Sequence, residues 1–363
     1  MIIIHGLLFR FKIPNRIVMA PMTRSFSPNH VPTPQVAEYY RRRAAHGVGL
    51  IITEGTCIDH PASNGHSNVP FMYGVEALAG WKNVVDVVHQ EDCKIIPQLW
   101  HVGAVRTMGS MPNPTVPGCS PSGLVAPGIR NGHVMSQQDI EDVVESFKRA
   151  ARSAMELGFD GVEIHGAHGY LIDQYFWNQT NHRTDKYGGS IFNRTRFAQE
   201  IIQAIRGDLG DDFLIVLRWS QWKMQSFNAN IVTNSQELNE FLQPLVNAGV
   251  DIFHCSTHRF WEPAFTDSDI SLAGLTKALS GRPTIAVGSV GMQQGFLDQV
   301  DLNKSKKEVD NLAELEKRMK KGEFDLIAIG RALIADAAWP EKIKNGSGQT
   351  IMPYDKSLLS LLE

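Results

Sequence analysis

Short apolar runs recur along the chain, and each is followed by a segment whose apolar residues have helical spacing. The runs are rich in Val, Ile and Phe and are apolar on both faces, which is typical of parallel strands buried on both sides. There are eight such runs: residues 16–22, 48–55, 93–101, 159–166, 213–220, 250–257, 283–290 and 324–331. Their regular alternation with helical segments predicts a parallel α/β fold.

The segments between the runs also carry helix-boundary signals. Ser136, followed three positions later by Asp139, has the pattern of a capping box, and Gly158 is placed to end the helix that starts there. Further helices are predicted near residues 36–45, 81–90, 197–206 and 234–249.

Eight strand–helix units favour a closed (β/α)8 TIM barrel over an open sheet. An open dinucleotide-binding sheet would need a G-x-G-x-x-G turn after its first strand, where this chain has "APMTRS" (20–25). We therefore predict an α/β fold with a single barrel domain over residues 1–363. The stretch 108–123, rich in Pro, Gly and Ser, is expected to be a loop over one end of the barrel.

Composition and charge exclude several function classes. A net charge of −3, without a Lys/Arg cluster interleaved with aromatic residues, argues against a nucleic-acid partner. The charge-rich stretch 301–316 is expected to be a solvated surface insertion or helix. The four cysteines contain no C-x-x-C pair, so a zinc or iron–sulfur site is not expected; they are Cys57, Cys93, Cys119 and Cys255.

Neither a leader nor a membrane segment is expected from the sequence. The N-terminal "MIIIHGLLFRF" has no basic lead-in and no small-residue cleavage site, and no stretch contains 18 consecutive apolar residues. We expect a soluble cytoplasmic protein with reduced thiols and no membrane partner. Oligomeric state stays open.

In TIM barrels, functional groups lie at the carboxyl ends of the strands. The seventh and eighth strands end in "VGSVG" and "AIGRAL", a position at which such barrels commonly bind phosphate through backbone N–H groups. Gln98 and Arg218 end two other strands, and together they suit a planar, anionic heterocycle. Tight turns and ordinary structural partners are the alternatives for these residues.

Several motifs stand in a fixed order along the chain: "NRIVMAPMTRS" (15–25), "QLWHVG" (98–103), "GFDGVEIHGAHGYLIDQY" (158–175), "RTDKYGGSIFNRTRF" (183–197), "VLRWS" (216–220), "VGSVG" (287–291) and "DLIAIGRALIAD" (325–336). In this order they resemble the Old Yellow Enzyme family of flavin-dependent ene-reductases, and the resemblance covers nearly the whole chain. It implies a TIM barrel with a tightly, non-covalently bound flavin mononucleotide (FMN). It also implies NADH or NADPH as a diffusible co-substrate.

Carried over by position, the resemblance assigns residues to the flavin ring. Pro21, Met22 and Thr23 would line it, with the Thr23 hydroxyl bonded to the ring carbonyl beside the reactive nitrogen. Gly55 would back the ring, and Gln98 would bond its pyrimidine edge.

The same carry-over assigns the charged end of the cofactor. Arg218 would support the pyrimidine side against the negative charge of reduced flavin. Gly288, Ser289, Gly330 and Arg331 would bind the phosphate.

The fourth-strand motif would supply the chemistry toward the substrate. His165 and His168 would bond the carbonyl oxygen of an α,β-unsaturated substrate, and Tyr170 would donate a proton. Two donors placed where enolate charge develops contribute roughly 3 kcal/mol each in comparable sites. The resemblance implies ping-pong reduction of activated C=C bonds in enones, maleimides, and quinone-like or nitro compounds.

Some positions depart from the family pattern. Position 23 is Thr, where one branch of the family has Cys. The stretches "WSQWKMQSF" (219–227) and "STHRFWEPAF" (256–265) are distinctive. Their aromatic residues either narrow the pocket or shape the end of the barrel; they are Trp219, Trp222, Phe260 and Trp261.

The sequence leaves two alternative functions for the chain. A metal-dependent TIM-barrel hydrolase could use His165 and His168 as ligands with Glu163, which faces the same side of its strand as His165. Glu54 and His101 are the other candidate ligands at strand ends, a poor set for a site that needs three convergent ligands. No metal is therefore expected. A catalytically idle binding barrel is the second alternative, and no feature of the sequence favours it.

Overall fold

The computed structural model describes residues 7–8, 12–266, 268–292 and 311–363. Its centre is a closed barrel of parallel strands that neighbour one another in chain order, with the last strand pairing with the first. The predicted (β/α)8 barrel is confirmed. The barrel strands are β3 (Ile17–Met19), β4 (Leu50–Cys57), β5 (Lys94–Trp100), β10 (Gly161–His168), β11 (Leu214–Lys223), β12 (Ile252–Ser256), β13 (Thr284–Val287) and β14 (Leu326–Ile329).

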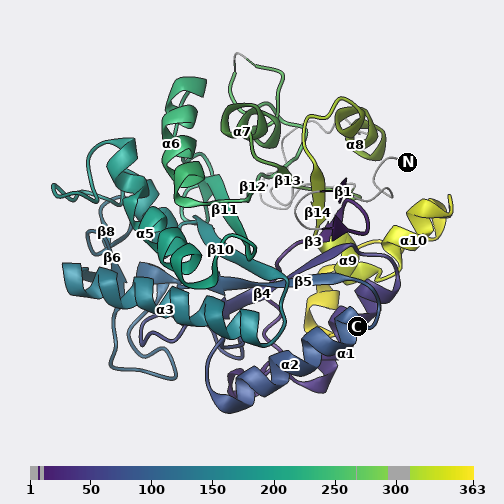
Figure 1. The fold of residues 1–363 in the computed structure, drawn as a ribbon, viewed down its shortest axis with the longest axis horizontal. Helices are drawn as coiled ribbons and strands as arrows, with labels where there is room; N and C mark the ends of the chain where they lie inside the picture. The colour runs from purple at the N-terminus through teal and green to yellow at the C-terminus, as the bar shows by residue number, and fades with distance from the viewer. Residues whose placement is uncertain (1–6, 9–11, 267, 293–310) are drawn as a thin grey trace.

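Helices surround these strands on the outside (Figure 1). The α-helices are α1 (Pro34–Ala45), α2 (Val75–His89), α3 (Gln137–Glu156), α4 (Leu171–Phe176), α5 (Ile191–Leu209), α6 (Ser235–Ala248), α7 (Leu272–Ser280), α8 (Asn311–Lys320), α9 (Arg331–Ala335) and α10 (Trp339–Lys344). Short 3-10 helices are η2 (Pro28–His30), η3 (Gly103–Val105), η5 (Gly348–Thr350) and η6 (Lys356–Ser360).

Helix ends follow the expected chemistry. The predicted capping box at Ser136 and Asp139 is present at the start of α3, and Asn234 caps α6, which ends at a left-handed Gly249. Helix α2 begins at Val75, six residues before the predicted start. The reason is that Gly74, with φ +82, turns the chain into the helix earlier.

The strands separate two apolar cores because successive side chains point to opposite faces. Inside the barrel lies a small core of aliphatic residues, including Val18, Leu50 and Val216. Between the strands and the helices lies a larger core, to which Trp81 and Phe147 belong. The inner core is aliphatic, and further toward the carboxyl ends of the strands Gln98, Glu163 and His254 bond to one another.

Smaller strands lie outside the barrel. They are β1 (Leu7–Leu8), β2 (Lys12–Ile13), β6 (Gly118–Ser120), β7 (Leu124–Ala126), β8 (Ile129–Arg130) and β9 (Gly132–Val134). The expected loop 108–123 therefore includes β6, which pairs with β9. Of the charge-rich stretch, residues 311–316 lie in α8, and 301–310 fall outside the described residues. Among described helices, none has the length and apolar character needed to cross a membrane.

Candidate active site at the mouth of the barrel

A layer of bonded polar side chains caps the aliphatic core. The carboxylate of Glu163 on β10 accepts a hydrogen bond from Gln98 Nε2 at 2.7 Å and contacts His254 Nδ1 at 2.6 Å. All three side chains are buried. The layer fixes the Gln98 amide with its nitrogen toward Glu163. The amide oxygen and the second N–H remain for a ligand above the layer.

Two histidines and a tyrosine lie together above this layer. The ring of His165 is 5.2 Å from that of His168 and 5.1 Å from that of Tyr170, between ring centroids. The backbone N–H of Ala167 donates to His165 Nδ1 at 3.4 Å, so the neutral ring carries its hydrogen on Nε2. The Tyr170 hydroxyl donates to the sulfur of Met224 at 3.4 Å.

Burial sets the protonation state of this cluster. It lowers the pKa of His165 and of His168 well below the usual value, and the nearby Arg218 charge lowers both further. Burial also raises the pKa of Tyr170 to about 12. At neutral pH the histidines are therefore uncharged N–H donors, and the tyrosine retains its proton.

Arg218 on β11 faces the same mouth with unused bonding capacity. Its Nη2 donates to Ser256 Oγ at 3.4 Å, while its Nε is buried without a partner within the described chain. Burial lowers its pKa from the usual value, although the guanidinium stays charged at neutral pH. A buried donor without a partner is costly, so this group fits a ligand that brings an acceptor atom.

A cavity of about 280 Å³ opens beside Arg218. Its walls come from the ends of β3, β10, β11, β12, β13 and β14 and from the residues that follow them. Eight residues predicted from the sequence line it: Pro21, Met22, His168, Arg218, Gly288, Ser289, Gly330 and Arg331. The cavity thus joins the predicted phosphate residues to the predicted ring residues in one space.

Glycine shapes the β13–β14 wall of this cavity. Gly288 has φ +149, and a Cβ there would lie 2.7 Å from the carbonyl oxygen of Thr257. The next residue, Ser289, donates from its hydroxyl to the carbonyl oxygen of His258 at 2.8 Å. A side chain at position 288 would clash with the 257–259 segment, so glycine lets backbone line the cavity here. This close approach fits an anionic group held by backbone N–H groups.

Comparison with known proteins assigns the chain to a family. The model of the NADH:flavin oxidoreductase / NADH oxidase family matches residues 9–349. The chain belongs to this family. The resemblance to Old Yellow Enzyme stated from the sequence is confirmed.

Relatives in rice (Oryza sativa subsp. japonica) resemble the chain to different extents. A putative 12-oxophytodienoate reductase 11 is 33% identical over 351 residues, covering 92% of this chain and 88% of the relative. A putative 12-oxophytodienoate reductase 2 is 43% identical over 207 residues, which cover 55% of this chain and 54% of the relative. The chain thus matches about half the length of some of its relatives and most of the length of others.

Solved structures of family members share the fold. Morphinone reductase in complex with tetrahydroNAD has a TM-score of 0.81 at 27% identity, over 98% of this chain and 93% of the other. The Old Yellow Enzyme homologue from Zymomonas mobilis has a TM-score of 0.80 at 24% identity, over 99% of this chain and 96% of its own, which supports the fold alone.

The other predicted residues do not line this cavity. Gln98, His165 and Tyr170 belong to the groups described above, and Thr23 is exposed in the segment that follows β3. Gly55 makes room for a tryptophan, since a Cβ there would lie 2.5 Å from the Trp100 ring. Trp100 in turn packs edge-on against Tyr170 at 4.9 Å.

Three residues that shape this site were not assigned to it from the sequence, although Glu54 was noted at a strand end as a candidate metal ligand. Glu54 accepts the backbone N–H groups of Arg24 and Ser25 at 2.9 and 3.1 Å and so holds the segment after Thr23. Burial raises its pKa to about 7. On β12, His254 and Ser256 alternate with apolar neighbours, a pattern that places both inside the barrel. That alternation was the available signal.

Of the four aromatic residues expected to narrow the pocket or shape the end of the barrel, Trp222 lines the cavity. Its ring lies 4.4 Å from that of His168 and 4.5 Å from that of His258. Trp219 and Phe260 are fully buried in the outer core, and Trp261 packs against that core. Trp219 and Phe260 do not line the cavity, which leaves them the other predicted role, at the end of the barrel. Alternation along β11 turns Trp219 away from the mouth.

The metal-hydrolase alternative is not favoured by the arrangement of its ligands. Glu163 is held by Gln98 and His254, and His101 Nε2 contacts His60 Nδ1 at 2.9 Å. Glu54 bonds backbone N–H groups. Within the described ranges, no three His, Cys, Asp or Glu side chains are grouped as a metal would require.

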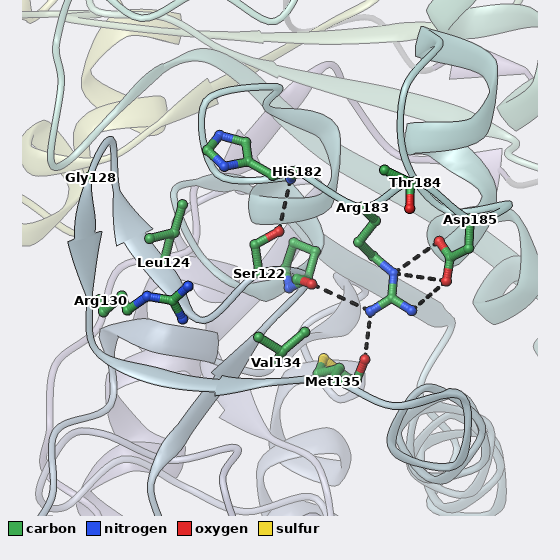
Figure 2. Close-up of a pocket in the computed structure, with 11 residues that line it drawn as sticks. Ser122, Leu124, Gly128, Arg130, Val134, Met135, His182, Arg183, Thr184 and Asp185 are labelled. Atoms are coloured by element: carbon green, nitrogen blue, oxygen red, sulfur yellow. Dashed lines mark hydrogen bonds and ion pairs between the residues drawn. The ribbon is translucent and has the colours of Figure 1, made fainter.

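A larger cavity of about 850 Å³ lies away from the mouth, between the β7–β8 hairpin and residues 182–185 (Figure 2). Arg183 crosses its wall, pairing with Asp185 and donating to the carbonyl oxygens of Pro121 and Met135. Arg183 of the motif "RTDKYGGS" thus bonds the loop after α4 to the segments that follow β6 and β9. The motif does not line the cavity beside Arg218.

Proposed function

We propose that the protein is an FMN-dependent NAD(P)H oxidoreductase that reduces activated C=C bonds, working as one flavin-binding domain. The observation that carries the proposal is one shared mouth. His165, His168 and Tyr170 lie within ring contact on one side of it, and Arg218 faces a glycine-walled cavity on the other. Oxyanion donors, a proton donor and an anion site are the groups that this chemistry needs.

The residues that would hold the flavin divide by its parts. The phosphate would bind at Gly288, Ser289, Gly330 and Arg331, where backbone can approach closely. Arg218 would meet the anionic side of the ring with its unpaired Nε. The remaining ring contacts would come from Pro21, Met22, Thr23, Gly55 and Gln98.

When bound, the flavin supplies hydride transfer between a nicotinamide and an alkene. The chain's own groups act on the substrate. His165 and His168, both neutral, would donate N–H bonds to the carbonyl oxygen and stabilise enolate charge as it develops. The Tyr170 hydroxyl would hold its proton at neutral pH and give it to the α carbon. The nicotinamide and the alkene would use the same open space in turn, which gives ping-pong kinetics.

The relatives support a substrate class. They include 12-oxophytodienoate reductases and morphinone reductase, and the latter has been solved with a nicotinamide analogue. We propose small enones as substrates of this chain, together with maleimides and quinone-like or nitro compounds. NADH and NADPH are both candidate donors. A cytoplasmic location remains a prediction.

An absorbance spectrum of the purified protein, followed by anaerobic titration, tests the proposal. We expect flavin bands that bleach with NADH or NADPH and return when 2-cyclohexenone is added. Protein that binds no flavin after incubation with FMN would overturn the proposal. So would bound flavin that neither nicotinamide reduces.

A further inference from the structure

A buried ion pair lies directly behind the reactive loop. Lys223 Nζ, at the end of β11, is 2.8 Å from Asp173 Oδ1 in α4, and neither side chain is exposed to solvent. Burial raises the pKa of Asp173 to about 6 and lowers that of Lys223, while each partner's charge works against that shift. A buried pair of this kind gives little net stability over apolar residues of the same size, and its strict geometry is its main effect.

Asp173 holds the backbone between His168 and Tyr170. The other carboxylate oxygen of Asp173 accepts the backbone N–H of Gly169 at 2.6 Å. Gln174 Nε2, one residue further in α4, donates to the Gly169 carbonyl oxygen at 2.8 Å. Gly169 has φ +83 and stands between His168 and Tyr170. Both of its backbone polar groups are thus bonded to α4.

Lys223, the other member of the ion pair, holds the end of strand β11. Lys223 Nζ donates to the carbonyl oxygen of Ser220 at 2.9 Å, and Ser220 Oγ accepts the backbone N–H of His168 at 3.0 Å. The backbone N–H of Met224 donates to the His168 carbonyl oxygen at 3.3 Å. Met224 also contributes the sulfur that receives the Tyr170 hydroxyl. The segment 220–224 therefore fixes the backbone of His168 and the hydroxyl of Tyr170.

The ion pair is the direct side-chain link between these two supports. We propose that Asp173 and Lys223 are positioning residues that set the place of His168 and Tyr170 over the bound substrate. This inference rests on the proposed function. Neither residue lines the cavity, so each acts through the 168–170 loop.

The two half-reactions should respond differently when the pair is lost. Oxidation of the nicotinamide needs no proton from Tyr170, whereas reduction of the alkene does. A displacement near 1 Å of a reacting group commonly costs about 100-fold in rate. Loss of the pair should therefore slow the alkene step while flavin reduction continues. A residue that only supports the fold would change both steps together or neither.

The test is stopped-flow kinetics of flavin-loaded Lys223→Met, with each half-reaction measured separately. We expect reoxidation by 2-cyclohexenone to slow by roughly 10- to 100-fold, and reduction by the preferred nicotinamide to stay within about twofold. Binding of p-chlorophenol, followed by its long-wavelength absorbance with the flavin, should weaken by about tenfold because His168 is displaced. Equal loss in both half-reactions, or no loss in either, would overturn the proposal.

Two further variants keep the result decisive. If the lone Asp173 charge prevents folding of Lys223→Met, the neutral double variant Asp173→Asn with Lys223→Met decides, since Asn retains an acceptor for Gly169. Wild-type rates in both half-reactions of the double variant would overturn the proposal.

Asp251→Asn is the matched control, because it breaks the Arg206–Asp251 pair (2.6 Å) at the opposite end of the barrel. It should lower stability without separating the half-reactions, and the same separation in this control would also overturn the proposal. A wild-type enzyme that binds flavin but reduces no enone would refute the proposed function instead.

Discussion

The two sides of the barrel mouth are built by different means. On the β10–β11 side, side chains carry the site: His165, His168 and Tyr170 touch one another, and an ion pair lies behind them. The strand register shifts between Gly166 and His168, and His168 itself has φ +66. On the β13–β14 side the pairing has no such shift, and glycine and backbone form the wall.

The difference follows from what each side has to bind. A proton donor must meet one carbon at one angle, so its side chain needs support from several directions. An anion accepts bonds from many directions but needs close approach, which glycine permits and a bulky side chain prevents. On the β10–β11 side, hydrogen bonds and an ion pair therefore hold the reactive side chains in place. On the β13–β14 side, the absence of bulky side chains leaves room for an anion to reach the backbone.

The largest expected effect comes from Tyr170→Phe on the reactive side. We expect alkene reduction to slow by about 10²- to 10⁴-fold, the usual contribution of a general acid, with flavin reduction by the nicotinamide unchanged. Single-turnover kinetics of each half-reaction measure both. Tyr175→Phe is the matched control: its buried hydroxyl also donates to a methionine sulfur at 3.4 Å, that of Met135, but away from the mouth. Equal slowing of both half-reactions in Tyr170→Phe would refute its role as proton donor.

Much of this contrast could be read from the sequence. The eight apolar runs predicted the barrel because both faces of parallel strands are buried. The phosphate residues Gly288, Ser289, Gly330 and Arg331 were predicted from their position at the ends of the seventh and eighth strands. The alternation of Glu163 and His165 predicted their common face, and both contact groups inside the barrel.

The supports behind the reactive groups could not be predicted in the same way. Asp173 and Lys223 are far apart in the chain. They meet where Lys223 pairs with His168, after the register shift between β10 and β11. Gly55 accommodates Trp100 across two strands, a contact that depends on the three-dimensional packing. Sequence periodicity assigns a face to each residue, but which residues meet across that face depends on register and bulges.

The two sides should also differ in their sensitivity to acid, because the reactive side contains buried histidines. We therefore expect the stability of the protein to depend on pH. The folded-state pKa lies well below the usual value in His101, His165 and His168, and below it in His254. Below pH 6.5 the unfolded chain takes up protons that these rings refuse, so their contribution to stability is lost as pH falls. Each contributes about 1.4 kcal/mol per pH unit.

Two buried carboxyls oppose this trend. The raised pKa values of Glu54, about 7, and Asp173, about 6, mean that the folded state holds their protons more tightly than the unfolded state. The buried histidines outnumber these two carboxyls, so we expect a net loss of stability as the pH falls from 7.0 to 5.5. Urea unfolding at pH 5.5 and 7.0 measures it. Stability that rises on acidification would contradict the neutral state of the histidines.

On the opposite side, the corresponding change is Gly288→Ala. The positive φ and the 2.7 Å approach to Thr257 predict a loss of about 1–3 kcal/mol in the free energy of unfolding, together with weaker retention of flavin. Urea unfolding and the flavin content after gel filtration check both. Gly207→Ala in α5 is the control, since a Cβ there meets no atom within 4 Å; it should stabilise by about 0.5–1 kcal/mol. Unchanged flavin retention in Gly288→Ala would show that the close approach does not serve the cofactor.

The smallest expected effect is at Trp222, a side chain that contacts both sides. The Trp222 ring packs at a tilt against His168 and against His258, and the carbonyl oxygen of His258 accepts the Ser289 hydroxyl. The indole Nε1 of Trp222 donates to the Ser256 carbonyl oxygen at 3.2 Å. Trp222→Phe retains an aromatic ring but loses the N–H bond, worth about 1 kcal/mol. Because the ring lines the cavity, this loss should raise the KM for enones by about two- to fivefold and leave kcat nearly unchanged. Steady-state kinetics with 2-cyclohexenone measure KM and kcat separately.

Trp219→Phe, on the same strand but facing the outer core, is the control and should affect stability alone. A change in KM for Trp219→Phe as large as that for Trp222→Phe would mean that the strand, and not the Trp222 ring, connects the two sides.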